Sequence, residues 1–156
     1  MTDDQARPTI ITPVHLEYDY SPGEAATRFL RQISKGRYVG QRCPKCKKVY
    51  VPPRGSCPTC GVATEEEVEL AQTGTITAFC IVNIPFAGQA VECPYVSATI
   101  KLDGADIGFY HLIQEIPYDQ IHIGMRVEAV WKPRDEWGPT TESIAHFRPV
   151  GGGSDA

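Results

Sequence analysis

The sequence predicts a mainly β protein: an N-terminal amphipathic helix, then a rubredoxin-like four-cysteine ribbon, then a five-stranded barrel of the OB-fold type. Two Cys-x-x-Cys pairs separated by ten residues indicate the ribbon. Apolar residues at helical spacing precede these pairs, and five short segments rich in β-branched and aromatic residues follow them. The 156 residues thus divide into an extended arm (1–20), the helix (21–36), the ribbon (37–64), the barrel (65–149) and a flexible tail (150–156).

The arm is predicted to be extended because Pro8 and Pro13 interrupt any helix there. Behind them, apolar and polar side chains alternate, as in a strand with one apolar face. The apolar members are Val14, Leu16, Tyr18 and Tyr20. We expect the arm to pack on its own domain or on a partner.

The helix has both start and stop signals. Ser21 can act as the N-cap, Pro22 suits the first helical position, and Gly36 suits the C-terminal stop. A single helix ahead of a small ribbon has little core of its own, so its apolar face must be buried on the next domain or on a partner. We favour the partner, and predict an interface that includes Phe29, Leu30 and Ile33.

The four-cysteine segment predicts a metal centre with the ligands Cys43, Cys46, Cys57 and Cys60. Each Cys-x-x-Cys turn offers two thiolates, and four thiolates at roughly 2.3 Å suit zinc. Such a site has no open position for water or substrate, so we expect structural rather than catalytic zinc. Two disulfides and a four-thiolate iron centre are the alternatives.

The N-terminal residues and the composition favour a cytoplasmic protein. The chain starts with polar and acidic residues and has no apolar run behind them, unlike a secretory signal. The most apolar stretch, 77–86, is too short to cross a bilayer, so no membrane association is expected. In a reducing compartment, six cysteines favour metal ligation over disulfides.

Charge is unevenly distributed along the chain, whose net charge is −4. Residues 25–64 contain nine Lys or Arg and no Asp or Glu, which predicts a local surface that faces anions. The alternative is that these cations only offset the negative charge of the four thiolates. The candidate group for binding an anionic ligand or partner is Arg28, Arg31, Lys35, Arg37, Arg42, Lys47, Lys48 and Arg54.

Five strands are predicted for the barrel, at 74–82, 95–102, 107–113, 126–131 and 143–148. Asp103-Gly104 marks a turn, and a short helical turn is expected within 117–124. The acidic segment 65–70 reads as a lead-in to the barrel. In and beside the loop 132–141, Trp131 is predicted to lie in the core and Trp137 to be available for a partner interface.

No catalytic residue is predicted. Cys80 sits mid-strand like a small buried hydrophobe, and Cys93 lies beside a proline at a strand entrance. The four histidines are scattered, without metal-ligand or Cys–His spacing. Serine-nucleophile and phosphate-loop motifs are absent.

Taken together, the motifs resemble a known family. They are Gln41-Arg42-Cys43-Pro44-Lys45-Cys46, Val51-Pro52-Pro53-Arg54, Cys57-Pro58-Thr59-Cys60-Gly61, Gly74-Thr75-Ile76, Pro94-Tyr95-Val96 and Gly124-Met125-Arg126-Val127. Over roughly Gly23 to Arg148 the chain resembles the zinc-ribbon plus OB-fold proteins associated with acyl-CoA enzymes, long classed as a domain of unknown function.

That resemblance implies an accessory subunit of sterol-carrier-protein-type thiolases or thiolase-like aldolases. The expected partner is a thiolase-like protein that carries the reactive residues and shares an acyl-CoA substrate with this chain in a hetero-oligomer. The expected setting is sterol or lipid side-chain degradation by thiolytic or retro-aldol C–C cleavage. The chain itself would help assemble the complex and hold the CoA moiety, with the basic group of 28–54 as the candidate for binding the CoA phosphates.

A nucleic-acid-binding module is the alternative function, because zinc ribbons and OB-folds both bind DNA or RNA. In a nucleic-acid-binding module, positively charged side chains should line the barrel. From Glu65 to the tail, thirteen acidic residues stand against five basic ones, which disfavours this alternative. An independent enzyme is disfavoured because no nucleophile or acid–base pair is evident.

Overall fold

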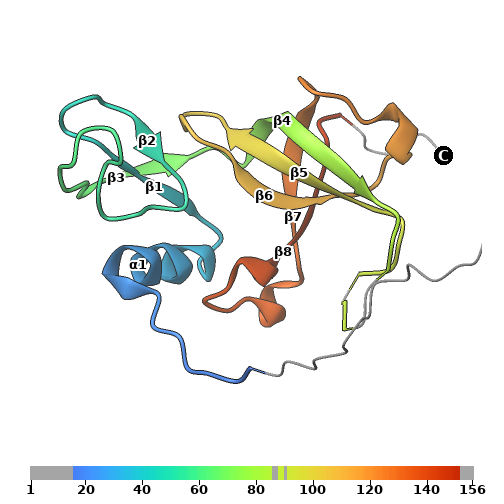
Figure 1. Cartoon of the computed structure of the whole chain (residues 1–156), viewed down its shortest axis with the longest axis horizontal. Coiled ribbons are helices and arrows are strands. Elements are labelled where there is room, and N and C mark those ends of the chain that lie inside the picture. The colour runs from blue at the N-terminus through green and yellow to red at the C-terminus, as the bar shows by residue number, and fades with distance from the viewer. Residues whose placement is uncertain (1–15, 86–87, 90, 152–156) are drawn as a thin grey trace, which may run out of the picture.

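The computed structural model describes residues 16–85, 88–89 and 91–151 (Figure 1). Helix α1 (Gly23–Ile33) precedes a three-stranded sheet of β1 (Tyr38–Arg42), β2 (Val49–Tyr50) and β3 (Glu66–Leu70). The barrel strands are β4 (Thr73–Val82), β5 (Tyr95–Leu102), β6 (Phe109–Ile113), β7 (Arg126–Trp131) and β8 (Ile144–Pro149). Short 3-10 turns are η1 (Tyr118–Gln120), η2 (Arg134–Glu136) and η3 (Thr141–Ser143).

The barrel closes in the order β4-β5-β6-β8-β7. All neighbours are antiparallel except β6 and β8, which run parallel and meet at Ile113 and Phe147. The turn η1 lies between the third and fourth strands of the barrel, where the sequence predicts one. The mainly β prediction of a helix, a ribbon and an OB-fold barrel is therefore confirmed.

The ribbon sheet has β1 at its centre, with β2 and β3 on either side. The structure differs from the sequence reading at 65–70, because β3 pairs with β1 from Arg42–Glu66 to Tyr38–Leu70. Leu70 is buried and Val68 half-buried, whereas the glutamates of β3 are exposed. The strand signal was this short apolar alternation, which the density of glutamates obscured.

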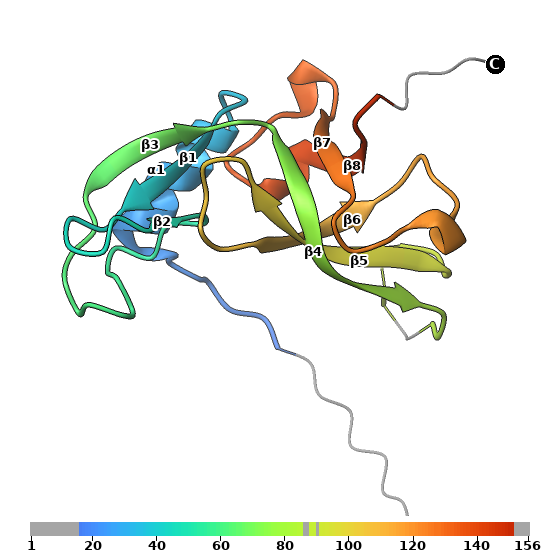
Figure 2. The same cartoon turned by 90° about the horizontal axis from the view of Figure 1, so that it is seen from above.

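The helix packs on its own chain. It lies beside β1 in both views (Figures 1 and 2). Phe29 and Ile33 are buried, with 5% and 0% of their surface exposed, in one cluster with barrel residues such as Phe147. The prediction that Phe29 and Ile33 belong to a partner interface is therefore wrong, since no surface of theirs is left for a partner. Leu30, half-buried at the edge of this cluster, retains some accessible surface.

Trp137 also contacts the chain itself. Its indole lies so close to Gly36 that a Cβ there would come within 2.5 Å of the ring, and Gly36 has a φ of +77°. The indole N–H donates to the Lys132 carbonyl at 2.7 Å, and the ring packs 4.9 Å from that of Trp131. Trp137 thus holds the 132–141 loop against the residues that follow the helix. Because Trp137 is only half-buried, its use in a partner interface stays a prediction. Trp131 is half-buried and packs edge-on against Tyr38.

Two further positions are exposed. Leu16, Tyr18 and Tyr20 are each at least 75% exposed, so the described part of the arm does not pack its apolar face on its own domain, and packing on a partner stays a prediction. Residues 1–15, including Val14, lie outside the described residues. Cys80 is exposed rather than buried, because it lies on the outer face of β4 between Phe79 and Ile81, which pack on the core. Within the described part of the chain, no helix has the length and apolar character needed to cross a bilayer.

Candidate metal centre and surrounding surfaces

The two cysteine knuckles have the same backbone geometry. In the first, Lys47 N–H donates to the Cys43 carbonyl at 3.0 Å, and Cys43 N–H donates to that of Lys48 at 2.9 Å. In the second, Gly61 N–H donates to the Cys57 carbonyl at 2.9 Å, and Cys57 N–H to that of Val62 at 2.8 Å. Lys47 and Gly61, which each follow the second cysteine of a pair, both have a φ of +64°. The left-handed conformation turns each knuckle so that both its thiols face inward.

The knuckles bring the four predicted ligands together. All four sulfur atoms, of Cys43, Cys46, Cys57 and Cys60, lie within 4.8 Å of one another. Cys46 Sγ and Cys57 Sγ are 3.6 Å apart, well beyond the roughly 2.05 Å of a disulfide bond, and all six cysteines are free. A convergent set of four thiols fits a tetrahedral metal ion, and Cys43 and Cys57 are almost fully buried.

Hydrogen bonds to sulfur favour the thiolate form at two of the four cysteines. The backbone N–H groups of Lys45 and Cys46 each lie 3.4 Å from Cys43 Sγ and lower its pKa. The buried Tyr50 hydroxyl lies 3.2 Å from Cys57 Sγ and lowers the pKa of that thiol to about 6. Burial, by contrast, raises the pKa of the Cys60 thiol to about 12, so this ligand would lose its proton only to a bound cation.

The metal centre is attached directly to the barrel. Val49, at the start of β2, donates its N–H to the Asp106 carboxylate at 2.8 Å, and its carbonyl accepts from Asp106 N–H at 3.0 Å. Ile107 packs against the cluster of Cys43, Tyr50 and Cys57. The β5–β6 turn therefore serves as one wall of the ribbon.

Three of the predicted anion-binding cations are already paired with carboxylates. Arg37 contacts Glu69 at 2.7 Å and Arg42 contacts Glu66 at 3.0 Å. Arg28 lies 3.1 Å from Glu24 and 3.7 Å from Glu67. The unrecognised strand β3 supplies most of these acids, so part of the basic segment is neutralised within the fold.

Five members of the predicted group remain without an ion pair among the described residues, and all five are exposed. They are Arg31, Lys35, Lys47, Lys48 and Arg54. The first two lie at the end of α1 and just beyond it, whereas the others lie in the ribbon loops. These side chains are available to an anionic group, in a solvent-exposed position where Coulomb interactions are modest.

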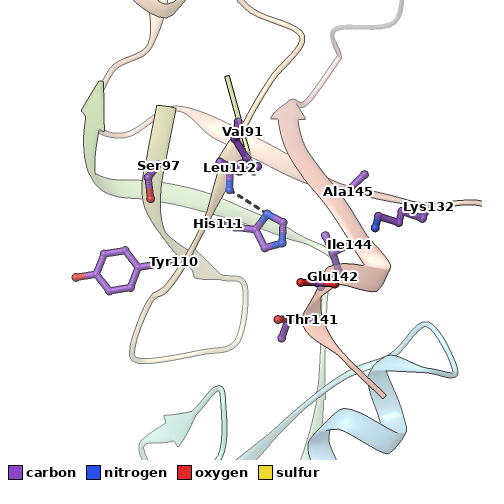
Figure 3. Close-up of a pocket in the computed structure, with 10 residues that line it drawn as sticks. All are labelled: Val91, Ser97, Tyr110, His111, Leu112, Lys132, Thr141, Glu142, Ile144 and Ala145. Atoms are coloured by element: carbon purple, nitrogen blue, oxygen red, sulfur yellow. Dashed lines mark hydrogen bonds between the residues drawn. The ribbon is translucent and has the colours of Figure 1, made fainter. Parts of the chain in front are cut away.

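A pocket of about 570 Å³ opens at the seam between β6 and β8 (Figure 3). These strands share a single paired position, so their upstream parts diverge and leave the space. The lining comprises Val91, Ser97, Tyr110, His111, Leu112, Lys132, Thr141, Glu142, Ile144 and Ala145. Its two charged residues, Lys132 and Glu142, are of opposite sign, which makes it a poor site for a phosphate group.

His111 joins the two sides of this seam. Its Nδ1 accepts the Leu112 N–H at 3.0 Å (Figure 3), and its ring packs 5.5 Å from that of Phe147 on β8. Burial lowers the pKa of His111, which favours the neutral ring that this acceptor role requires. The sequence pattern did not single out this residue, because a lone histidine in a strand has no distinguishing spacing.

Among the described residues, no cysteine is hydrogen-bonded to a histidine. The Cys93 sulfur lies near the Gln89 amide, at 3.5 Å from Nε2. The neutral ring of His111 is held by backbone groups, and His146 contacts Glu115 at 2.8 Å. The geometry thus offers a metal centre, exposed cations and a pocket, but no assembled nucleophile and base.

The family models match both halves of the chain. The model described as ChsH2, rubredoxin-like zinc ribbon domain, matches residues 34–66, and that described as ChsH2, C-terminal OB-fold domain, matches residues 67–132. The four convergent thiols and this ribbon match together identify a structural zinc site.

Known proteins and solved structures share this arrangement. A DUF35 domain-containing scaffold protein of Methanocaldococcus jannaschii is 37% identical over 108 residues, covering 67% of this chain and 75% of that protein. A probable enoyl-CoA hydratase alpha subunit of Thermomonospora curvata is 36% identical over 99 residues, 64% of this chain but only 30% of that protein.

Among solved structures, the Ltp2-ChsH2(DUF35) aldolase matches with a TM-score of 0.65 and 28% identity, covering 85% of this chain and 99% of that chain. A DUF35-family protein of unknown function from Sulfolobus solfataricus matches with a TM-score of 0.60 and 19% identity, covering 81% and 84%. The latter likeness shows the fold alone.

Proposed function

This chain belongs to the DUF35 family, and we propose that it is a non-catalytic, zinc-stabilised accessory subunit of a thiolase-like enzyme that acts on acyl-CoA substrates. The observation that carries the proposal is the match of the ribbon and barrel to nearly the whole of one chain of the Ltp2-ChsH2(DUF35) aldolase. The scaffold name of the archaeal relative supports the same role. The closed metal centre, and the lack of an assembled nucleophile and base among the described residues, support a partner that carries the reactive groups.

Within this proposal, the reaction is thiolytic or retro-aldol cleavage of a C–C bond in a sterol or lipid side chain carried on CoA, in the cytoplasm. The chain contributes the five unpaired cations, Arg31, Lys35, Lys47, Lys48 and Arg54, to CoA phosphates or to an acidic surface of the partner. Arg28, Arg37 and Arg42 are less available because each already contacts a glutamate.

Co-purification from the native host tests the role. Intact-mass and metal analysis should find a stoichiometric thiolase-like partner and about one zinc per chain. A zinc-loaded chain without a partner, or one that carries nucleic acid, would contradict the proposal and favour the nucleic-acid alternative.

Charge reversal tests the surface separately. In the reconstituted complex, Lys47→Glu with Lys48→Glu, and Arg31→Glu with Lys35→Glu, should weaken CoA binding or partner binding by about tenfold. Lys101→Glu, an exposed reversal on β5, is the matched control. Unchanged affinities for both CoA and partner would remove these cations from the proposal while leaving the accessory role intact.

A further inference from the structure

The strand β4 lies in a long uncharged stretch of the chain. Between Glu69 and Glu92 no residue is Asp, Glu, Lys, Arg or His. Natural edge strands usually carry a charge, a proline or a bulge that discourages pairing with another chain. The segment Ala78–Val82 has neither charge nor proline, and its register shift lies just before it, between Ile76 and Ala78.

One edge of this segment is unpaired in the structure. On one side, β5 pairs with β4 along its length as far as Val82. On the other, β7 reaches only Thr73–Thr75, and Ile76 bonds to the backbone of Met125 and Gly124. Beyond Ile76, no described strand lies on that side, and Figure 2 shows the end of β4 running away from β7.

The backbone groups on the free edge suit a two-fold partner. The Asn83 side-chain amide reaches the Ile81 carbonyl at 3.3 Å, so Ile81 directs its backbone to the unpaired side. Antiparallel strands alternate, so Phe79 directs its backbone the same way and Cys80 between them faces β5. An antiparallel copy of this strand, centred on Cys80, would pair Phe79 of each chain with Ile81 of the other through two reciprocal hydrogen bonds.

We propose that β4 forms an intermolecular sheet with β4 of a second copy of this chain, with Cys80 on the two-fold axis. Because the segment carries no charge, two copies of it can pair without electrostatic repulsion. A second copy of the chain therefore fits this edge, and no complementary charge on a different partner is needed. Cys80 and its counterpart occupy a non-hydrogen-bonded pair, where Cα atoms approach to about 4.5 Å. Both side chains are exposed and therefore report directly on the pairing.

The test uses the purified, zinc-loaded full chain. Sedimentation should show a dimer, and a short bis-maleimide should join two chains through Cys80, as located by peptide mapping in a Cys93→Ser background. The variant Cys80→Lys places a charge on the axis and should raise the dimer dissociation constant by about tenfold or more. Ile123→Lys, an equally apolar exposed site outside β4, should leave it unchanged.

The proposal is overturned if the chain sediments as a monomer, if Cys80→Lys remains as dimeric as the Ile123→Lys control, or if the cross-link maps elsewhere. Protection of β4 amides only after a thiolase-like protein is added would instead assign the edge to a strand of that partner. Zinc content and far-UV circular dichroism of each variant confirm that the chain is folded. The outcome is independent of the accessory function, since no enzyme partner is present in the first measurement.

Discussion

The ribbon and the barrel reach a fixed structure by different physical means. Among the described residues, the ribbon buries only a small cluster around Cys43, Tyr50 and Cys57, beside four thiols that are placed to hold zinc. The barrel shares a much larger apolar cluster with α1, centred on side chains such as Ile100 and Phe147 that have no exposed surface. A metal thus replaces the apolar core that a segment of this size cannot build.

The two regions are nevertheless connected. Tyr38, on the ribbon strand β1, lies inside the barrel cluster beside Trp131 and Phe109, and Asp106 joins the β5–β6 turn to Val49. Loss of zinc from the ribbon should therefore also lower the stability of the barrel, and a cavity in the barrel core should also lower that of the ribbon, each to a smaller degree. Three perturbations, from the largest effect to the smallest, measure how far the regions depend on each other.

Removal of one zinc ligand should have the largest effect. Structural zinc supplies about 10–16 kcal/mol of binding free energy in small zinc-finger peptides at pH 7, and Cys57→Ser removes a buried ligand. We expect zinc to be lost and amides of 38–64 to exchange rapidly, while β5 and β8 stay protected. Metal analysis and hydrogen exchange measure this, and Cys80→Ser is the control that keeps its zinc. Full protection of the ribbon without metal would contradict the comparison.

A cavity under the helix should have the next largest effect. Ile33 has no exposed surface, so Ile33→Ala should lower the free energy of unfolding by about 2–5 kcal/mol. Urea denaturation measures the loss, and Ile123→Ala, at a site 65% exposed, should change stability by less than about 0.5 kcal/mol. Equal stability of the two variants would mean that α1 is not part of the barrel core.

The regions also differ in how far they can be predicted from sequence. The four cysteines reveal the metal centre because their spacing is local, and the barrel strands follow from β-branched runs between turn residues. The ribbon strand β3 is not predicted from the sequence, because only Val68 and Leu70 form its apolar alternation and the other residues are glutamates. Pairing between β3 and β1 then removed three arginines from the predicted anion-binding set.

The remaining failures share one cause, which is that burial depends on non-local packing. An amphipathic helix shows that Phe29 and Ile33 are buried, but not whether a partner or the barrel buries them. Trp137 stacks over Gly36 about a hundred residues away in sequence, a contact that no local pattern encodes. Cys80 is exposed because its neighbours Phe79 and Ile81 pack on the core, which leaves Cys80 on the outer face of β4.

A surface ion pair on the barrel should have the smallest effect, and one confined to that region. Arg126 binds Asp103 through two hydrogen bonds of 2.7 and 2.5 Å and holds the pKa of that carboxyl at about 2. The usual Asp pKa is about 3.9, so the folded state binds the proton less well than the unfolded state. The stabilisation is therefore complete above about pH 4 and is lost as the pH falls toward about 2.

Because the side chains of Asp103 and Arg126 are 43% and 48% exposed, solvent screening limits the contribution to less than about 1 kcal/mol. Asp103→Asn should be slightly less stable than wild type at pH 6, and the difference should shrink below pH 4 and nearly vanish at about pH 1.5, as measured by urea unfolding of the barrel. Comparison with Asp119→Asn, an exposed position without an ion pair among the described residues, separates this effect from acid release of zinc, which all three proteins share. A difference that is as large at about pH 1.5 as at pH 6 would assign the role of Asp103 to its turn beside Gly104, with φ of +90°, rather than to its charge.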